Sequence, residues 1–446
     1  MMNVSIIGTG YVGLVTGVCL TEKGHQVVCV DVDQEKVDKI NQAISPIYEE
    51  GLEELLKKNI NINLKVTTDL HKSVIETDIS FIAVGTPFNG SEIDLTYVKE
   101  VAYQIGKSLQ KKSSYHLVVM KSTVVPGTTD EVVLPILENA SGKKAGVDFG
   151  VGMNPEFLRE GEAIDDYMSP DRIVFGGIDE RSIDVLEKLY SVFEGVDKLK
   201  TNNKTAEMIK YTSNSLFATM ISFSNEIGNL CSSIGGVDVV DVMRGVHLDK
   251  RLSPINLNGD RIVPSFTTYL EAGCGFGGSC FPKDVKALVS FGKKVGRSMQ
   301  LLNAVIRVNE EQPKQILSIL KKHFSSLKRV RIAILGLAFK PGTDDMRESP
   351  AIPIIKELLS RKAKITAFDP VVKNSVQNNF GSDNIMYCNS LDKAIQDVEV
   401  IILLSRCEDF RAIPEMLSNH KPQPLFIDGR RMLDKGNIKK YEGIGM

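Results

Sequence analysis

The sequence predicts an α/β protein in which two Rossmann-like, doubly wound domains are joined by a central helical domain with one long helix. Three observations predict this fold class. A strand, a glycine-rich turn, a helix and a second strand open the chain, the same alternation returns after about residue 330, and a long helical pattern without proline lies between them. At 446 residues the chain is too long for one core. We expect domains at residues 1–203, 204–308 and 309–446.

The composition is that of an ordinary soluble globular protein, with 42% hydrophobic and 25% charged residues. A net charge of −2 gives no electrostatic case for nucleic acid or for an anionic membrane. Seven cysteines without paired spacing favour a reducing compartment. The stretch Val4–Leu20 lacks a basic leader and contains four glycines, so a buried strand and the start of a helix explain it better than a signal peptide. We therefore expect a cytoplasmic protein without a membrane or nucleic-acid partner.

The first strand, Asn3–Ile7, runs directly into the turn Gly8-Thr9-Gly10-Tyr11-Val12-Gly13, followed by a helix to about Lys23 and a strand at Val27–Val30. This is the dinucleotide-binding pattern in its required context. The first glycine permits the tight turn, the second lets backbone approach a pyrophosphate, and the third allows close packing of helix on strand. Asp31 ends the second strand, where a carboxylate binds ribose hydroxyls and repels a 2′-phosphate, so NAD is favoured over NADP.

The next two strands end in small polar residues. Ile79–Val84 runs into Gly85-Thr86-Pro87, and Leu117–Lys121 runs into Ser122-Thr123. Since ligands bind beyond the carboxyl ends of parallel strands, Thr86 and Thr123 are candidates to face the cofactor; capping or turn residues are the alternative. A further strand at Gly150–Met153 precedes Glu156 and Glu160. These two acids are either a solvated helix pair or a base and a cofactor contact.

A long helical pattern covers Thr205 to about Ser233 and suits a central spacer or a dimer seam. Lys210 and Asn214 are four residues apart and so share one face of this helix. A surface lysine is the usual alternative for Lys210. The proline-containing segment Leu252–Ser265 predicts an irregular loop.

The stretch Gly275–Asp284 places Cys280 between a glycine-rich approach and a Pro-Lys-Asp exit. Glycines allow backbone to come close to a ligand, and a thiol beside a lysine and a carboxylate has a reason to ionise and a nearby proton carrier. Cys280 is therefore a candidate nucleophile. A buried structural cysteine in a glycine-rich turn is the alternative.

The C-terminal part repeats the strand–helix–strand alternation. A strand at Val330–Leu335 runs into Gly336-Leu337-Ala338-Phe339-Lys340-Pro341, a helix covers about Pro350–Arg361, and a strand at Lys364–Phe368 ends in Asp369. The three-glycine turn is missing, so we expect a second doubly wound domain with a different ligand. Further strands are expected at Val398–Ser405 and Pro424–Ile427. Lys340 and Arg430 follow strands and could bind phosphate.

Together these motifs give the chain a resemblance to the UDP-glucose/GDP-mannose dehydrogenase family, from Val4 to about Leu433. The segments that carry it occur in family order: GTGYVGL, VGTP, KST, NPEFLREGEAIDD, AEMIKYTSNSLFAT, GFGGSCFPKD, LGLAFKPGTDDMRESP and FIDGRR. The resemblance implies an NAD-binding domain, a central helical domain that forms a homodimer, and a C-terminal domain for a sugar nucleotide. It also implies oxidation of the sugar C6 alcohol to a carboxylate in two NAD-dependent steps. We expect NAD and no metal.

The resemblance assigns roles to individual residues. Cys280 forms a thiohemiacetal and then a thioester, Lys210 and Asn214 stabilise oxyanions, and Asp284, Glu156 and Thr123 handle water and protons. The positions implied for NAD are Gly8, Gly10, Tyr11, Val12, Gly13, Asp31, Lys36, Gly85, Thr86, Thr123, Glu160, Lys283 and Arg347. Those implied for the sugar nucleotide are Glu156, Phe157, Leu158, Lys210, Asn214, Arg251, Arg261, Phe276, Gly277, Phe339, Lys340 and Arg430.

One segment departs from the family pattern, which places an Asp-x-Arg-Ile-Gly element shortly before the cysteine. Here Asp249-Lys250-Arg251-Leu252 and Asp260-Arg261-Ile262 are two imperfect copies separated by an insertion. In the family, the arginine of this element reaches into the neighbouring subunit. The residues around Arg251 match the context upstream of the family element, which favours Arg251 for this role. The Ser-Cys-Phe-Pro-Lys-Asp form favours UDP-glucose as the substrate over GDP-mannose or another nucleotide sugar. An inactive sugar-nucleotide-binding regulator is the alternative from another functional class.

Overall fold

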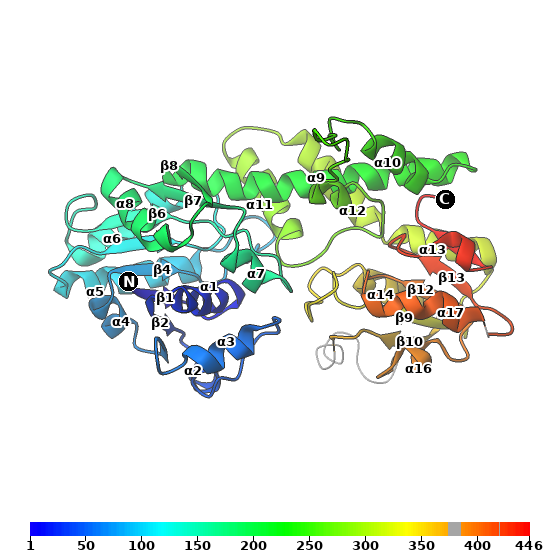
Figure 1. Cartoon of the computed structure of the whole chain (residues 1–446), viewed down its shortest axis with the longest axis horizontal. Coiled ribbons are helices and arrows are strands. Elements are labelled where there is room, and N and C mark those ends of the chain that lie inside the picture. Colours follow the sequence, from blue (N-terminus) through cyan, green and yellow to red (C-terminus); the bar gives the residue numbers. More distant parts are fainter. Residues whose placement is uncertain (373–384, 419) are drawn as a thin grey trace. The chain divides into compact units, whose positions relative to one another are not determined.

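The computed structural model of the protein describes residues 1–372, 385–418 and 420–446. The chain divides into two compact units, Met1–Ser213 (unit 1) and Asn214–Met446 (unit 2). Each unit is built around one β-sheet with helices on both of its faces (Figure 1).

The sheet of unit 1 has the strand order β3-β2-β1-β4-β5-β6-β7-β8. Neighbouring strands are parallel except β6 and β7, which are antiparallel. The strands are β1 (Asn3–Ile7), β2 (Gln26–Val30), β3 (Leu64–Thr67), β4 (Ile79–Ile82), β5 (Leu117–Met120), β6 (Gly150–Met153), β7 (Arg172–Gly177) and β8 (Asp197–Thr201). The strand order reverses at β1, next to β4, and this is the place where open parallel sheets bind ligands.

Two hydrophobic cores cover the two faces of this sheet. One is formed with α1, α2, α3, α7 and α8, the other with α4, α5 and α6. The helices are α1 (Tyr11–Glu22), α2 (Gln34–Asn41), α3 (Leu52–Asn59), α4 (Leu70–Glu76), α5 (Thr96–Lys111), α6 (Leu134–Ser141), α7 (Ala163–Met168) and α8 (Glu180–Leu189), with short turns η1 (Thr129–Val133) and η2 (Tyr190–Val192). Burial on both faces explains why β4 and β5 consist mostly of apolar residues.

Helix α9 (Asn203–Ile234) is one continuous helix of 32 residues (Figure 1). It confirms the long helix predicted from the pattern between Thr205 and Ser233. The boundary between the two units falls inside it, so Lys210 belongs to unit 1 and Asn214 to unit 2.

In unit 2 the described strands form one parallel sheet in the order β11-β10-β9-β12-β13-β14. They are β9 (Arg331–Leu335), β10 (Lys364–Phe368), β11 (Ile385–Tyr387), β12 (Val400–Leu403), β13 (Leu425–Asp428) and β14 (Tyr441–Gly443). The described helices are α10 (Val239–His247), α11 (Phe281–Lys294), α12 (Gln300–Glu311), α13 (Lys314–His323), α14 (Ala351–Ser360), α16 (Leu391–Ile395) and α17 (Ile413–Ser418), with turns η3 (Ser265–Tyr269), η4 (Glu408–Ala412) and η5 (Lys435–Asn437). The predicted fold class is confirmed: both units contain a doubly wound sheet.

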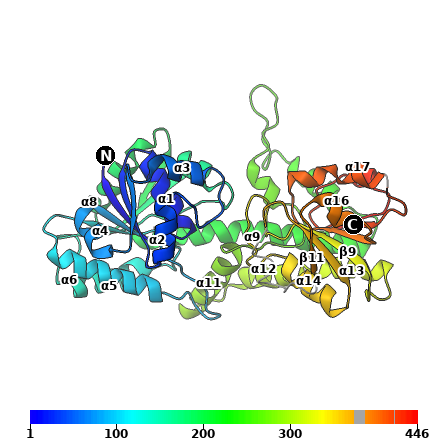
Figure 2. The ribbon, with the colours of Figure 1, turned by 90° about the horizontal axis from the view of Figure 1, so that it is seen from below.

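Two local features refine the sequence interpretation. The segment before η3 is irregular as expected, with one bridge between Ile255 and Arg261, and Figure 2 shows it as a long light-green loop. Glu156 and Glu160 precede α7 and lie in a non-helical segment, so the interpretation as a helix pair is wrong. Pro155 disfavours a helix for the residue before it, and Gly161 has φ +84°, so this segment does not form a helix.

In the part of the chain that the structure describes, no helix combines the length and the apolar character needed to cross a membrane.

Candidate functional site

The glycine-rich turn after β1 has the geometry of a dinucleotide cradle. Gly8 has φ +107°, and a Cβ there would lie 2.6 Å from the Ala83 carbonyl oxygen at the end of β4. A Cβ on Gly13 would lie 1.9 Å from the Gly8 carbonyl oxygen. Gly10, in contrast, is the exposed N-cap of α1 and has open space beside it. The turn therefore keeps room for a ligand at the N-terminus of α1, where backbone N–H groups favour a pyrophosphate.

Asp31 lies where β2 ends and faces the same turn. Its Oδ2 accepts hydrogen bonds from Thr9 N (2.9 Å) and Thr9 Oγ1 (2.6 Å), and Lys36 Nζ on α2 is 3.9 Å away. Burial acts to raise the pKa of Asp31, but these donors and Asp33 N outweigh it and hold the pKa below its ordinary value. An ionised carboxylate at this point fits a ribose with free hydroxyls.

Glu49 holds Tyr11 of the glycine-rich turn and was not predicted from the sequence. Its buried carboxylate accepts hydrogen bonds from the Tyr11 hydroxyl, from Gly161 N (2.7 Å) and from Ala163 N (2.7 Å). Burial and this contact raise the pKa of Tyr11 far above its ordinary value. One side chain thus joins the start of α1 to the segment that carries Glu156 and Glu160.

The ends of β4 and β5 are also joined. Thr86 Oγ1 donates to the Thr123 carbonyl oxygen (2.9 Å), and Ser122 Oγ donates to the Val84 carbonyl oxygen (2.6 Å). The structure therefore brings Thr86 and Thr123 together beside the exposed Gly85, at the carboxyl edge of the sheet. The Thr86 hydroxyl thus joins two strand ends that are 37 residues apart in sequence.

Glu156 and Lys210 form a buried ion pair. Lys210 Nζ is 2.9 Å from Glu156 Oε1, and the two side chains are 4% and 6% exposed. Lys210 also lies over the Phe157 ring at 5.5 Å, and Leu158 N donates to Glu156 Oε2 (2.7 Å). Burial acts to raise the pKa of Glu156, but the charge and hydrogen bond of Lys210 and the Leu158 N–H lower it overall. The surface interpretation of Lys210 is therefore wrong, and Glu160 lies half-buried nearby in the same segment.

Lys121 is a second buried lysine that sequence reasoning missed. Its Nζ donates to Asn154 Oδ1 (2.8 Å), and that oxygen also accepts from the Tyr190 hydroxyl (2.6 Å). Burial lowers the pKa of Lys121 to about 7, against the charge of Glu156. The Lys-Ser-Thr motif, which begins with Lys121, was the feature of the sequence that could have indicated this residue.

In unit 2, Cys280 is the N-cap residue of α11, with its Sγ 3.5 Å from Ser279 Oγ. The N-terminus of a helix stabilises negative charge, which favours a thiolate. One turn later Asp284, 1% exposed, accepts hydrogen bonds from Asn214 Nδ2 (2.6 Å) and Lys283 Nζ (2.6 Å). The half-buried thiol and the buried carboxylate lie four residues apart, on one face of α11.

The glycines before Cys280 pack against the loop that follows β9. A Cβ on Gly277 would lie 2.3 Å from the Glu348 carbonyl oxygen, and a Cβ on Gly278 would lie 2.7 Å from the Phe339 ring. Arg430 adds hydrogen bonds to the carbonyl oxygens of Gly275 (2.8 Å) and Phe339 (3.5 Å). The sequence-predicted residues of the sugar-nucleotide set in these two segments are thus brought together.

Two more residues of that set, Phe276 and Lys340, lie in the same two segments, as does Arg347 of the set predicted for NAD. Phe276 N donates to Asn309 Oδ1 (2.8 Å), and the Phe276 ring is edge-on to Phe281 at 6.0 Å. Lys340 is half-buried next to Phe339, and Arg347 pairs with Asp345 at 2.8 Å on the exposed side of the loop.

The two candidate arginines of the insertion behave differently. Arg261 Nη1 donates to the carbonyl oxygens of Leu248 (2.9 Å) and Ser253 (2.8 Å), so it holds its own loop. The Arg251 side chain is 89% exposed and pairs with Asp249 at 2.5 Å. Arg251 is therefore the one whose guanidinium extends from the loop.

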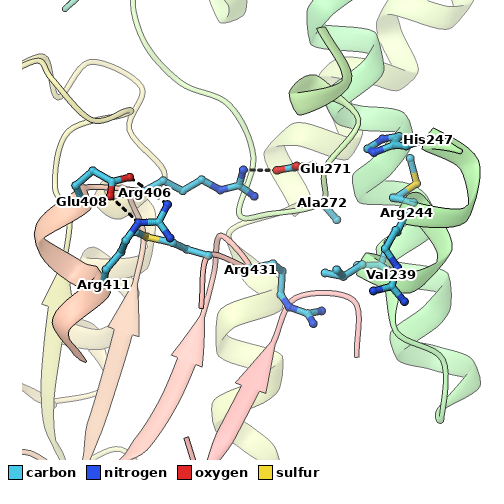
Figure 3. Close-up of a pocket in the computed structure, with 12 residues that line it drawn as sticks. Val239, Arg244, His247, Glu271, Ala272, Arg406, Glu408, Arg411 and Arg431 are labelled. Atoms are coloured by element: carbon cyan, nitrogen blue, oxygen red, sulfur yellow. Dashed lines mark hydrogen bonds and ion pairs between the residues drawn. The ribbon is translucent and has the colours of Figure 1, made fainter. Parts of the chain in front are cut away.

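A cavity of about 450 Å³ lies elsewhere in unit 2, beside α10 (Figure 3). Arg406 pairs with Glu271, Arg411 pairs with Glu408 within η4 at one side of the cavity, and Arg431 pairs with Asp238 at 2.8 Å. The predicted site residues do not line this cavity. Among the described residues, no group of three or more His, Cys, Asp and Glu side chains is arranged to hold a metal ion.

Comparison with known proteins identifies the family. Three family models match the chain in order: the UDP-glucose/GDP-mannose dehydrogenase family NAD binding domain at residues 2–194, the central domain at 204–311 and the UDP binding domain at 333–435. The chain belongs to the UDP-glucose/GDP-mannose dehydrogenase family. Members of this family are NAD-dependent nucleotide-sugar 6-dehydrogenases, so the protein is an oxidoreductase with NAD as its cofactor.

Individual members of the family are similar over the whole chain. A UDP-glucose 6-dehydrogenase of Haloferax volcanii is 38% identical over 99% of this chain and 100% of its own length. A GDP-mannose 6-dehydrogenase of Pseudomonas savastanoi is 41% identical over 97% and 95%. The structure of a UDP-glucose dehydrogenase from Pyrobaculum islandicum matches with a TM-score of 0.89 at 37% identity, covering 100% of this chain and 98% of that one. The open space at Gly10 and the ionised Asp31 fit the family's NAD.

Proposed function

We propose that the protein is an NAD-dependent UDP-glucose 6-dehydrogenase that oxidises UDP-glucose to UDP-glucuronate through a covalent intermediate on Cys280. The observation that carries the proposal is the placement of Cys280 at the N-terminus of α11, one turn before the buried Asp284. UDP-glucose is favoured by the Ser-Cys-Phe-Pro-Lys-Asp segment and by relatives that bear this name along the whole chain.

The four-electron oxidation divides into two hydride transfers with one cysteine step between them. The C6 alcohol loses a proton and a hydride and becomes an aldehyde. The Cys280 thiolate adds to the aldehyde carbon and forms a thiohemiacetal, whose loss of a second hydride gives a thioester. Water then attacks the thioester, the carbon–sulfur bond breaks, and the carboxylate and the thiol are released. NAD, when bound, accepts one hydride in each oxidation, so two NAD are reduced per sugar.

The charged groups around these steps have distinct tasks. The Lys210 ammonium stabilises the alkoxide and the oxyanion of the thiohemiacetal, and Asn214 donates to the same oxygen. Glu156 keeps Lys210 charged and in place through their 2.9 Å contact. Because its pKa is lowered, Glu156 is ionised at neutral pH and can accept a proton from water, as can Asp284; the Thr123 hydroxyl orients that water.

The ligand contacts follow the family resemblance. The turn Gly8–Gly13 with Asp31, Lys36, Thr86 and Glu160 holds NAD, and the resemblance adds Lys283 and Arg347 to these contacts. The sugar nucleotide is held by Phe157 and Leu158, and by Phe276, Gly277, Phe339, Lys340 and Arg430. The open Gly10 and the close approach at Gly277 support these assignments.

We also propose a cytoplasmic homodimer with domains at 1–203, 204–308 and 309–446. Helix α9 exposes Leu216, Phe223 and Leu230, each about half exposed and seven residues apart, which gives one apolar stripe. A second copy of the chain would cover that stripe. Arg251, which extends from its loop, would then reach the substrate of the other subunit.

A panel of sugar nucleotides assayed for NADH formation tests the substrate. We expect turnover with UDP-glucose and much weaker turnover with GDP-mannose and UDP-N-acetylmannosamine. Turnover with GDP-mannose alone would replace the assignment by GDP-mannose 6-dehydrogenase, a candidate that the 41% identical relatives favour.

Replacement of the nucleophile tests the covalent step. Cys280→Ser is expected to abolish uronate formation, while Cys388→Ser, a half-buried cysteine on the edge of the unit 2 sheet, serves as the matched control and retains it. A Cys280→Ser variant that forms uronate at the parent rate would refute the thioester.

A further inference from the structure

The first two turns of α9 are joined to the segment that follows Thr123. The Glu207 carboxylate is completely buried, and each of its oxygens accepts hydrogen bonds from that segment. Oε2 accepts from Gly127 N (2.6 Å), and Oε1 accepts from Thr129 N (2.8 Å) and Thr129 Oγ1 (2.6 Å). The carboxylate thus accepts hydrogen bonds from three donors that lie 78 to 80 residues away in the sequence.

Two polar contacts beside Glu207 join the same two segments. Asn203 Nδ2 donates to Asp130 Oδ1 (2.7 Å), and Lys204 Nζ is 2.6 Å from Glu131 Oε1. The lysine and glutamate side chains of the second contact are 52% and 66% exposed. Exposed pairs contribute little, and Glu207 accepts three hydrogen bonds where the buried Asn203 donates one, so Glu207 makes most of the buried contacts between the two segments.

The position of Glu207 gives this connection a consequence for the reaction. It lies three residues before Lys210 on the same helix, and residues three apart lie on the same side of a helix. The segment that it holds begins at Thr123, whose carbonyl oxygen accepts the Thr86 hydroxyl. The carboxylate therefore links the helix that carries Lys210 to the chain that follows Thr123, at Gly127 and Thr129.

We propose that Glu207 is a positioning residue for the dehydrogenase reaction: it holds the Thr123 segment against the turn of α9 that presents Lys210. The inference rests on the proposed function, which gives Thr123 and Lys210 their roles. Glu207 is completely buried and acts through these two residues.

The electrostatics of Glu207 make the connection sensitive to pH. Burial raises the pKa of Glu207 to about 7 even though the Thr129 and Gly127 donors lower it, and the charge of Asp130 raises it further. Lys204, on the other side, is engaged by Glu131. The ionised carboxylate accepts all three hydrogen bonds, whereas a protonated carboxyl has one oxygen that also carries a proton and accepts less well. The connection is therefore complete above pH 7 and weaker below it.

Glu207→Gln in the full-length enzyme is the main test, because the amide has one acceptor oxygen and presents an NH₂ to a backbone N–H. We expect kcat at pH 8 to fall roughly tenfold to a hundredfold, as misplacement of a catalytic group by about 1 Å does. KM for NAD and for the sugar nucleotide should change less than about threefold. The ratio of parent to variant kcat should shrink as the pH falls below 7, and amides of residues 123–133 should exchange hydrogen faster in the variant.

Three further variants separate positioning from general damage. Thr129→Val removes the hydroxyl donor and should give a smaller loss in kcat of the same kind; Thr129→Ser keeps the donor and should restore activity. Lys204→Gln breaks the exposed contact between the same segments and should leave kcat unchanged. The Thr129 variants keep the proposal testable if Glu207→Gln does not fold.

A Glu207→Gln enzyme whose kcat loss is the same at every pH, or whose segment 123–133 exchanges hydrogen as in the parent, would overturn the positioning role. Lys210→Ala distinguishes this failure from failure of the proposed function. Loss of turnover in Lys210→Ala with an unaffected Glu207→Gln refutes the positioning role alone. Undiminished turnover in Lys210→Ala refutes the role of Lys210 on which both depend.

Discussion

The glycine turns after β1 and after β9 begin in the same way and form different sites. Each follows the strand of its sheet that comes first in sequence, at the point where the strand order reverses. Gly8 has φ +107° and Gly336 has φ +91°. A Cβ on either would collide with the end of the adjacent strand, at 2.6 Å from the Ala83 oxygen or 2.4 Å from Ser405 Cβ. The shared topology therefore accounts for the shared first glycine.

The acidic residue after the second strand shows where the two units diverge. Asp31 Oδ2 accepts from Thr9 N and Oγ1, and its Oδ1 accepts from Asp33 N at 3.1 Å. Asp369 accepts four backbone N–H groups, from Leu337 and Ala338 on one oxygen and from Val371 and Val372 on the other. Each oxygen of the Asp369 carboxylate accepts two hydrogen bonds from the loop. The Asp31 carboxylate accepts fewer and can accept further hydrogen bonds from a ligand.

The helices differ as well. Helix α1 begins at Tyr11, within its glycine-rich turn, whereas α14 begins only at Ala351, after the long loop that starts at Gly336. Unit 1 thus presents a helix N-terminus to a dinucleotide, and unit 2 presents a loop. Identical strand order predicts where a ligand binds in each unit but not what the ligand is.

The largest expected effect is on the free energy of unfolding, which replacement of Asp369 should lower more than replacement of Asp31. Asp369→Ala leaves four backbone N–H groups without their acceptor and should lower the free energy of unfolding by about 3 to 5 kcal/mol. Asp31→Ala, at the open edge of its sheet, should lower it by about 1 kcal/mol or less. Denaturant unfolding of both variants measures the difference. Equal losses would show that the two carboxylates have the same role.

The next effect concerns the buried ion pair of unit 1. Glu156→Gln leaves Lys210 buried without its counter-ion and should cost about 3 kcal/mol at pH 7. Because the folded-state pKa of Glu156 lies below its ordinary value of 4.5, its contribution is present above pH 4.5 and is lost as the pH falls through the folded-state pKa. Unfolding curves of parent and variant should therefore converge in acid. A constant gap down to low pH would contradict the lowered pKa.

Binding of NAD, in contrast to stability, should depend strongly on Asp31. Asp31→Ala is expected to raise KM for NAD roughly tenfold, about 1.4 kcal/mol, with little change in KM for the sugar nucleotide. Steady-state kinetics with each substrate varied in turn measures both constants. Equal increases in the two would count against the ribose contact.

Lys36 should have the smallest effect. Its side chain is 43% exposed, and its Nζ is 3.9 Å from Asp31, so solvent screens the interaction. Lys36→Met should change the free energy of unfolding by less than about 0.5 kcal/mol and KM for NAD by about twofold. Titration at low and high salt checks this: a variant effect that persists in high salt would mean that Lys36 contacts NAD by more than charge.

Features set by residues close together in the sequence were predicted better than contacts between distant segments. The turn at Gly8, the strand ending at Asp31 and the long helix α9 depend on spacing within 30 residues or so, and all were predicted correctly. The burial of Lys210 was left open, because a helix face does not reveal what covers it. Glu49 and Glu207 were missed, since each acts on segments far away in the chain.

The insertion before η3 shows a further limit. Sequence similarity to a motif could not decide between Arg251 and Arg261, because both have an aspartate two residues or one residue before them. Hydrogen bonds of Arg261 to the Leu248 and Ser253 carbonyl oxygens give it a task within the loop. Only backbone geometry, which the motif does not encode, separates the two.

The stoichiometry of NAD reduction tests the central claim most directly. Purified protein with limiting UDP-glucose and excess NAD should form two NADH per UDP-glucuronate, without accumulation of the aldehyde, as followed by absorbance and mass spectrometry. One NADH per sugar with release of the aldehyde would contradict the proposal that Cys280 carries the substrate through both oxidations.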